Sequence, residues 1–271
     1  MLDVTRQLCQ SLFRQPEWCS AVSNETSRSV ERALCILCEL AKADTPVGIS
    51  EISRRTGYSK STVHLGLRTM RELSFVVQDP ESGRYSLGLA AAQLGVAAQE
   101  NSQLVTMLSA PMSELAVRSS EAVSLGVRVD SEVLFIKRFE TSHVLGTSIR
   151  EGTRMPLHAS ASGKALLMGM SNEEICSLFP DENLPREDSH AERGRTQLLD
   201  EIDKAREVGY VTSADEWRLG ISAAAVPVQI GSEVVASVSI AGPTSRFRAD
   251  LWVTDLLSLA APLTANTKRD Q

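Results

Sequence analysis

The side chains best suited to bind another molecule are concentrated between residues 59 and 71. They are short hydroxyl groups, one imidazole and three cations: Ser59, Lys60, Ser61, Thr62, His64, Arg68 and Arg71. Hydroxyls and backbone amides at the start of a helix can reach phosphate oxygens and base edges, and cations neutralise phosphates. The pattern therefore predicts a contact surface for double-stranded DNA, to which Arg84 adds one phosphate contact. The same cations would equally suit a solvated helix face, and His64 a packing position.

Patterns that would indicate catalysis are incomplete in this chain. A phosphate-binding loop ending at Lys164 needs glycine at 158 and serine or threonine at 165, where the chain has His158 and Ala165. A Ser-x-x-Lys nucleophile needs serine at 161, which is alanine. The serines near His158 lack a nucleophile-elbow sequence, and the four histidines are not paired at metal-ligand spacing. We therefore expect no enzymatic activity, no catalytic residue, no metal and no cofactor.

Cysteine content and hydropathy predict the compartment. The five cysteines are an odd number without a disulfide framework, so reduced thiols are expected. Cys35 and Cys38 lie in an apolar-periodic helix with no second pair at zinc-site spacing, which favours buried thiols. No run approaches the roughly 20 apolar residues of a membrane span, and the N-terminus lacks the apolar stretch of a signal peptide. These features predict a cytoplasmic protein without a membrane partner.

The elements that must position the cationic cluster can be predicted from hydrophobic periodicity. Apolar residues recur at helical spacing from Ser29 until the helix ends before Pro46. Residues 49–73 then form a helix-turn-helix, interrupted at Gly57, in which the second helix would lie in the major groove. Two short strands flank the turn residues 79–83. Three helices and a hairpin predict a winged helix, although such a bundle could also be a structural or protein-binding module.

The distal half alternates between helical and β-rich segments. Two helices in series are expected between Leu87 and about Ser120. The strands that follow are expected at 122–129, 132–139, 221–228 and 234–241. Helices are expected at 163–170, 196–208 and 250–265, and a further helix is expected to begin at a capping box formed by Ser171 and Glu174. Paired strands with helices between them indicate an α+β domain with a mostly antiparallel sheet.

The predicted elements divide the chain into four parts. They are a weakly ordered extension over 1–26, a winged helix-turn-helix over 27–88, a linker helix over 89–104 and an α+β domain over 105–271. The chain has a formal net charge of -6, which is unusual for a DNA-binding protein. Residues 27–86, however, contain nine Lys and Arg against seven Asp and Glu. The excess acid therefore lies outside the predicted DNA-binding part.

Five segments together resemble the IclR family of bacterial transcriptional regulators. In the first half they are Ser29–Leu34, Gly57–His64 and Gly83–Gly88, and in the second half Pro156–Ala165 and Ser237–Pro243. The resemblance implies a winged helix, a linker helix and a C-terminal effector-binding domain related to GAF-type sensors. It also implies a homodimer or a dimer of dimers on an operator. The chain departs from the family pattern at Leu65, where arginine is usual, and at Gly66, where leucine is common.

The resemblance further implies that small organic acids bind the distal domain. The residues implied to bind them are Met155, Ala161, Ser162, Asp215, Ile221, Ala223, Ser239 and Ala241. The small residues 159–163 precede a predicted helix, whose amides suit a carboxylate. Ala223 and Ala241 stand where relatives often have polar or sulfur-bearing side chains, so we expect a larger or less polar acid, such as an aromatic one. Asp215 and Glu216 would equally suit a solvated loop.

Taken together, these features predict a ligand-responsive transcriptional regulator of a metabolic operon, acting as a repressor rather than an activator. A ligand in the distal domain would change the spacing or mobility of paired helices on the DNA. Two alternatives are open at this stage. One is a ligand-binding sensor that acts through protein contacts, and the other is an enzyme that uses the distal pocket.

Overall fold

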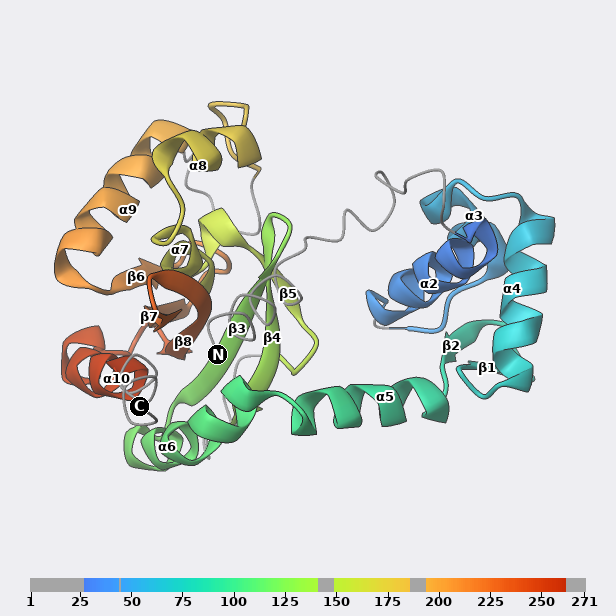
Figure 1. Ribbon diagram of the computed structural model, residues 1–271, viewed down its shortest axis with the longest axis horizontal. Coiled ribbons are helices and arrows are strands. Elements are labelled where there is room, and N and C mark those ends of the chain that lie inside the picture. The colour runs from blue at the N-terminus through green and yellow to red at the C-terminus, as the bar shows by residue number, and fades with distance from the viewer. Residues whose placement is uncertain (1–26, 44, 141–148, 186–193, 262–271) are drawn as a thin grey trace. The chain divides into compact units, whose positions relative to one another are not determined.

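The computed structural model describes residues 27–43, 45–140, 149–185 and 194–261 (Figure 1). These residues form two compact units, one ending at Ser102 and the other beginning at Gln103. The extension predicted over residues 1–26 lies outside the described residues.

The first unit contains the predicted winged helix. Its elements are α2 (Arg28–Ala41), α3 (Ile49–Thr56), α4 (Lys60–Glu72), β1 (Val76–Gln78), β2 (Tyr85–Leu87) and α5 (Leu89–Glu100). Helix α3 ends at Gly57, whose φ of 72° is a left-handed conformation that favours glycine. Helix α4 begins after Ser59, whose side chain accepts a hydrogen bond from the amide of Thr62 at 3.2 Å. The two helices of the helix-turn-helix therefore begin and end where local sequence signals predict.

The helices and the hairpin share one apolar core. It contains Ile36 of α2, Ile52 of α3, Leu67 of α4, Val76 of β1 and Tyr85 of β2, all buried. Strands β1 and β2 are antiparallel, and a further bridge joins Val47 to Tyr85. The unit is a winged helix-turn-helix.

The second unit is built on a six-stranded sheet. Its helices are α6 (Gln103–Ser119), α7 (Ala161–Leu167), α8 (Asn172–Leu178), α9 (Arg195–Val208) and α10 (Val253–Ala260), with short 3₁₀ turns at Leu157–Ala159 and Ala249–Leu251. Its strands are β3 (Ala122–Val129), β4 (Glu132–Phe139), β5 (Arg154–Pro156), β6 (Val211–Ala214), β7 (Ile221–Ile230) and β8 (Glu233–Pro243). Neighbouring strands are antiparallel in the order β5-β4-β3-β8-β7-β6, which confirms the α+β class.

Residues along the strands alternate between two differently covered faces. On one face Ala224, Val226 and Val228 of β7 pack with α6 and α10. On the other face the small residues Ala223 and Ala225 pack near α7, which contacts both β7 and β8. Figure 1 shows α6 and α10 on one side of the sheet and α7, α8 and α9 on the other. Small side chains on the second face leave room for α7 to lie close to the sheet.

Two strands and the bounds of two helices differ from the expectation. The helix expected over 163–170 is α7, which begins at Ala161 and ends at Leu167. Strands β5 and β6 have only three and four residues and pair at the two edges of the sheet, so they lack a recognisable alternation. The last helix was expected over 250–265, but a 3₁₀ turn precedes α10, and residues beyond 261 lie outside the described part. The capping box at Ser171 and Glu174 is confirmed, because both of its hydrogen bonds are present.

Candidate DNA-contact surface and ligand pocket

The outward face of α4 presents polar groups around a well-defined helix start. Val63, Leu67 and Met70 are buried against the core, so the opposite face points away from it. The Ser59 hydroxyl lies 2.9 Å from that of Ser61 and 2.8 Å from that of Thr62. Three hydroxyls thus cluster at the positive end of the helix, an arrangement that suits an anionic oxygen.

The predicted cations differ in how firmly they are held. The side chains of Lys60 and His64 are exposed and make no hydrogen bond or ion pair with any described residue. Among the described residues, the Arg68 side chain pairs only with Glu72, in an exposed ion pair with 3.5 Å between Nε and Oε1. Two further cations are fixed near the wing: Arg71 Nη1 donates to Gln78 Oε1 at 2.8 Å, and Arg84 Nη1 donates to the carbonyl of Pro46 at 2.8 Å. The donors nearest the start of α4 are therefore the most available.

Gly66 has a packing reason inside α4. A Cβ atom placed on Gly66 would lie 3.1 Å from Cδ1 of Ile36, closer than most side-chain contacts allow. Glycine therefore lets α4 lie close to α2, at a cost of about 1 kcal/mol in helix propensity. The short distance favours close packing over a helix bend as the reason for this departure from the family pattern.

The candidate ligand pocket lies between the second face of the sheet and the start of α7. Its cavity volume is only about 30 Å³, within about 440 Å³ of space between atoms that includes its open mouth. Its lining combines serine hydroxyls, small side chains, five larger apolar side chains and one arginine: Ser124, Phe135, Arg138, Ile149, Met155, Ala159, Ser160, Ala161, Ser162, Ser213, Trp217, Ile221, Ala223, Ser239 and Ala241. Seven of the eight residues expected from the family resemblance are in this lining.

Asp215, the eighth expected residue, is outside the lining. It has a φ of 57°, in the turn that precedes β7. Its Oδ1 accepts hydrogen bonds from the amide of Gly220 at 2.6 Å and from the hydroxyl of Thr244 at 3.0 Å. The first contact closes this turn, and the second links the turn to the residue that follows β8, so both contacts of Asp215 are made within the chain.

A polar row crosses the floor of the pocket. Arg138 of β4 pairs in register with Ser124 of β3, which pairs with Ser239 of β8. Arg138 Nη1 donates to Ser124 Oγ at 2.8 Å, and Ser162 Oγ of α7 donates to Ser239 Oγ at 2.7 Å. The Arg138 side chain is only 2% exposed, and its Nε donates to Glu140 Oε1 at 2.9 Å. A buried guanidinium beside three hydroxyls is well suited to bind a carboxylate.

Sequence reasoning missed Arg138 and Ser124. The expectation of few polar anchors, based on Ala223 and Ala241, is therefore incomplete. The available signal was a charged residue within the apolar run of β4, which is unusual for a buried strand. That charged residue alone did not show which side chains it contacts in the pocket, because those contacts depend on the register of three strands.

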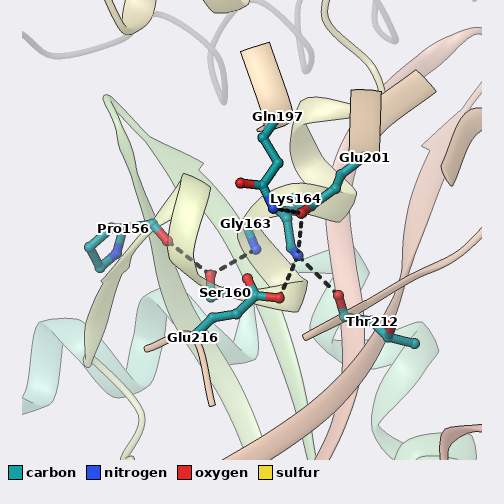
Figure 2. Close-up of polar contacts among 8 residues, drawn as sticks. All are labelled: Pro156, Ser160, Gly163, Lys164, Gln197, Glu201, Thr212 and Glu216. Atoms are coloured by element: carbon teal, nitrogen blue, oxygen red, sulfur yellow. Dashed lines mark hydrogen bonds and ion pairs between the residues drawn. The ribbon is translucent and has the colours of Figure 1, made fainter. Parts of the chain in front are cut away.

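A buried ion cluster lies beside the pocket (Figure 2). The Lys164 ammonium donates to Glu216 Oε1 at 2.9 Å, Glu201 Oε2 at 3.1 Å and the carbonyl of Thr212 at 3.0 Å. The Lys164 side chain is 1% exposed and that of Glu216 is 8% exposed. Glu216 directly precedes the pocket residue Trp217. The cluster thus connects α7, α9 and β6 to the wall of the pocket, and Glu216 is not a solvated loop carboxylate.

Other predicted features have less bearing on these sites. Cys35 is buried and Cys38 is half-buried within α2. Among the described residues, no group of three His, Cys, Asp or Glu has an arrangement suited to a metal ion. No described helix combines the length and apolar character needed to cross a membrane.

Comparison with known families matches both units. The IclR helix-turn-helix domain matches residues 29–80, and the C-terminal domain of the bacterial transcriptional regulator IclR matches residues 96–263. The HTH-type transcriptional regulator KdgR of Dickeya chrysanthemi is 33% identical over 248 residues, covering 91% of this chain and 78% of KdgR. The HTH-type transcriptional repressor AllR of Escherichia coli K12 is 30% identical over 258 residues, covering 94% of this chain and 93% of AllR.

Solved structures share the fold. An IclR transcriptional regulator from Alicyclobacillus acidocaldarius matches with a TM-score of 0.79 and 26% identity, covering 89% of this chain and 98% of that structure. An IclR homolog from Microbacterium hydrocarbonoxydans, solved in complex with 4-hydroxybenzoate, matches with a TM-score of 0.74 and 24% identity, covering 88% and 98%. The winged helix, the pocket-bearing domain and the matches along the chain lead to one conclusion: this protein belongs to the IclR family of bacterial transcriptional regulators.

Proposed function

We propose that this regulator represses a metabolic operon by binding an operator through α4, and that a small organic acid in the distal pocket changes that binding. The observation that carries the proposal is the set of available donors at the exposed start of α4. The name of the similar AllR protein, a repressor, supports repression. Action on chromosomal DNA would place the protein in the cytoplasm.

The proposed DNA contacts follow from exposure and position. The hydroxyls at the helix start and the free α4 amides would bind phosphate, while Lys60 and His64 would reach phosphates or base edges in the major groove. The remaining cations would contact the flanking backbone. The full proposed set is Ser59, Lys60, Ser61, Thr62, His64, Arg68, Arg71 and Arg84.

Salt-dependent DNA binding tests this assignment. Full-length protein would be titrated by fluorescence anisotropy against a duplex selected from a random-sequence library. The Lys60→Ala/Arg68→Ala double variant should bind more weakly. The slope of log affinity against log salt should fall in magnitude by about 4 for a dimer, because each of its two copies loses two phosphate contacts and each contact contributes about 0.9. Lys204→Ala removes an exposed cation from α9 and is the matched control. Wild-type affinity and salt dependence in the double variant would contradict the assignment.

We infer that the effector is an organic acid larger than two or three carbons. Arg138 and the serine row would bind its carboxylate, and Phe135, Met155 and Trp217 would cover its apolar body. The complex of a related protein with 4-hydroxybenzoate supports aromatic acids as the first class to test. The described lining contains no histidine, aspartate or glutamate to activate its serines, which favours ligand binding over catalysis.

Thermal shift measurements test the effector class. Benzoate and hydroxybenzoates should raise Tm, whereas benzamide, which lacks the negative charge, should not. Arg138→Met should abolish the shift. Arg154→Met, which removes an arginine outside the lining that pairs with Glu132, should retain it. Stabilisation only by two- or three-carbon acids, or an equal shift in Arg138→Met, would contradict the proposal.

We propose that two copies associate through α5. This helix has no buried residue in the chain, yet Leu89, Leu94 and Val96 are 80%, 59% and 55% exposed. An apolar helix facing water indicates a partner surface. A second copy would also match a palindromic operator. Sedimentation should show a dimer or tetramer that Leu89→Glu/Leu94→Glu weakens, and a wild-type monomer at micromolar concentration would contradict the proposal.

A further inference from the structure

Leu65 occupies an unusual position for an apolar residue. It is 64% exposed, although it lies in the middle of α4. The helix turns about 100° per residue, so Leu65, two residues after Val63 and two before Leu67, lies opposite the buried face. Ser61 and Arg68, about one turn to either side, share this outward face. The centre of the surface assigned to DNA is therefore a leucine side chain.

The surroundings of Leu65 do not form an apolar patch. The adjacent residues on the outward face are polar: Ser61, His64, Arg68 and Thr69. An isolated leucine among such groups is too small a surface for a stable protein partner. The backbone that presents it is also firmly placed, because the neighbouring Gly66 brings α4 close to Ile36 of α2. The backbone at Leu65 is thus held close to α2, and the exposed leucine side chain projects from a hydrophilic surface.

The chemistry of the DNA major groove limits what a leucine can recognise. Leucine has no hydrogen-bond donor or acceptor, so it cannot pair with the polar edges of guanine, adenine or cytosine. The apolar group that a base pair presents in the major groove is the C5-methyl group of thymine. We propose that Leu65 recognises a thymine in each operator half-site by direct contact with this methyl group. The inference rests on the proposed function and adds a sequence preference to it.

The proposal makes a quantitative prediction about one methyl group. Replacing thymine by deoxyuridine removes the C5-methyl and leaves base pairing unchanged. Burial of one such group corresponds to about fourfold in the dissociation constant. We therefore expect one thymine per half-site at which this replacement weakens binding by about fourfold.

The test combines DNA and protein changes. A duplex would be selected from a random-sequence library with full-length protein, and its thymines replaced one at a time by deoxyuridine. Leu65→Ala should bind the thymine and deoxyuridine duplexes equally at the sensitive position. Leu73→Ala is the matched control, because Leu73 is 61% exposed but lies at the C-terminal end of α4, and it should keep the fourfold difference.

The outcomes separate this inference from the proposed function. If a specific duplex is selected but all of its thymines can be replaced without loss of affinity, the proposed role of Leu65 is overturned and DNA binding through α4 is not. The same conclusion would follow if Leu65→Ala kept the wild-type sensitivity to deoxyuridine, because another residue would then contact the methyl group. Failure to select any duplex would overturn DNA binding through α4 and this inference with it.

Discussion

The two sites of this protein use the same kinds of side chain in opposite ways. Lys60 at the start of α4 is exposed and has no partner among the described residues, whereas Lys164 beside the pocket is 1% exposed and has three acceptors. Likewise Arg68 lies in a loose surface pair, while Arg138 is buried on the pocket floor. Exposed cationic side chains are available to bind a large anion, whereas buried cationic side chains fix the local geometry through their hydrogen bonds.

The difference also predicts how each site responds to its surroundings. Exposed cations act over a distance that salt screens, so α4 should lose affinity steeply as ionic strength rises. Buried cations are screened much less and discriminate between ligands by geometry. We therefore expect the affinity of α4 for DNA to depend mainly on charge, and the ligand selectivity of the pocket to depend on the arrangement of its hydrogen-bond donors.

The largest expected effect comes from removing the buried lysine. Lys164→Met leaves the carboxylates of Glu201 and Glu216 without their shared cation and should lower the free energy of unfolding by about 3–5 kcal/mol. Lys60→Met should leave unfolding almost unchanged while weakening DNA binding. Urea denaturation followed by circular dichroism measures the free energy of unfolding of both variants. Equal stability losses would show that the two lysines do not differ in the way described.

A smaller effect is expected from the helix caps of the two units. Ser59→Ala and Ser171→Ala each remove a hydroxyl that accepts a hydrogen bond from a backbone amide at the start of a helix. Each change should lower the free energy of unfolding by about 1 kcal/mol. Only Ser59→Ala should also weaken DNA binding, because its hydroxyl lies on the α4 surface. Thermal melts and anisotropy titrations separate the two effects. A similar loss of DNA binding in Ser171→Ala would contradict a direct contact by Ser59.

The smallest effect concerns the turn of the wing. Hydrogen bonds from Ser82, and then from the amide of Glu81, hold the pKa of the Asp79 carboxyl below its ordinary value. The ionised form is therefore favoured by folding, so its contribution to stability is present above about pH 4 and is lost as the pH falls through the lower, folded-state pKa. Hydrogen exchange of the Ser82 amide should accelerate over this acidic range relative to Asp79→Asn. Identical profiles in the two proteins would contradict the effect.

The sequence predicted α4 well because its signals are local. Ser59, the apolar spacing that follows it and the break at Gly57 all act within a few residues. The pocket was predicted only in part, since the row from Arg138 through Ser124 to Ser239 joins residues far apart in the chain through strand register. Strands β5 and β6 were missed because they are held by their neighbours rather than by a pattern of their own.

The effect of a bound acid on DNA affinity shows whether the pocket and α4 are coupled. An aromatic acid that raises Tm would be added to wild-type protein, Arg138→Met and Arg154→Met during an anisotropy titration with the selected duplex. We expect the acid to change the dissociation constant for DNA in the wild type and in Arg154→Met, but not in Arg138→Met. A dissociation constant that the acid leaves unchanged in the wild type, or changes equally in all three proteins, would contradict this expectation.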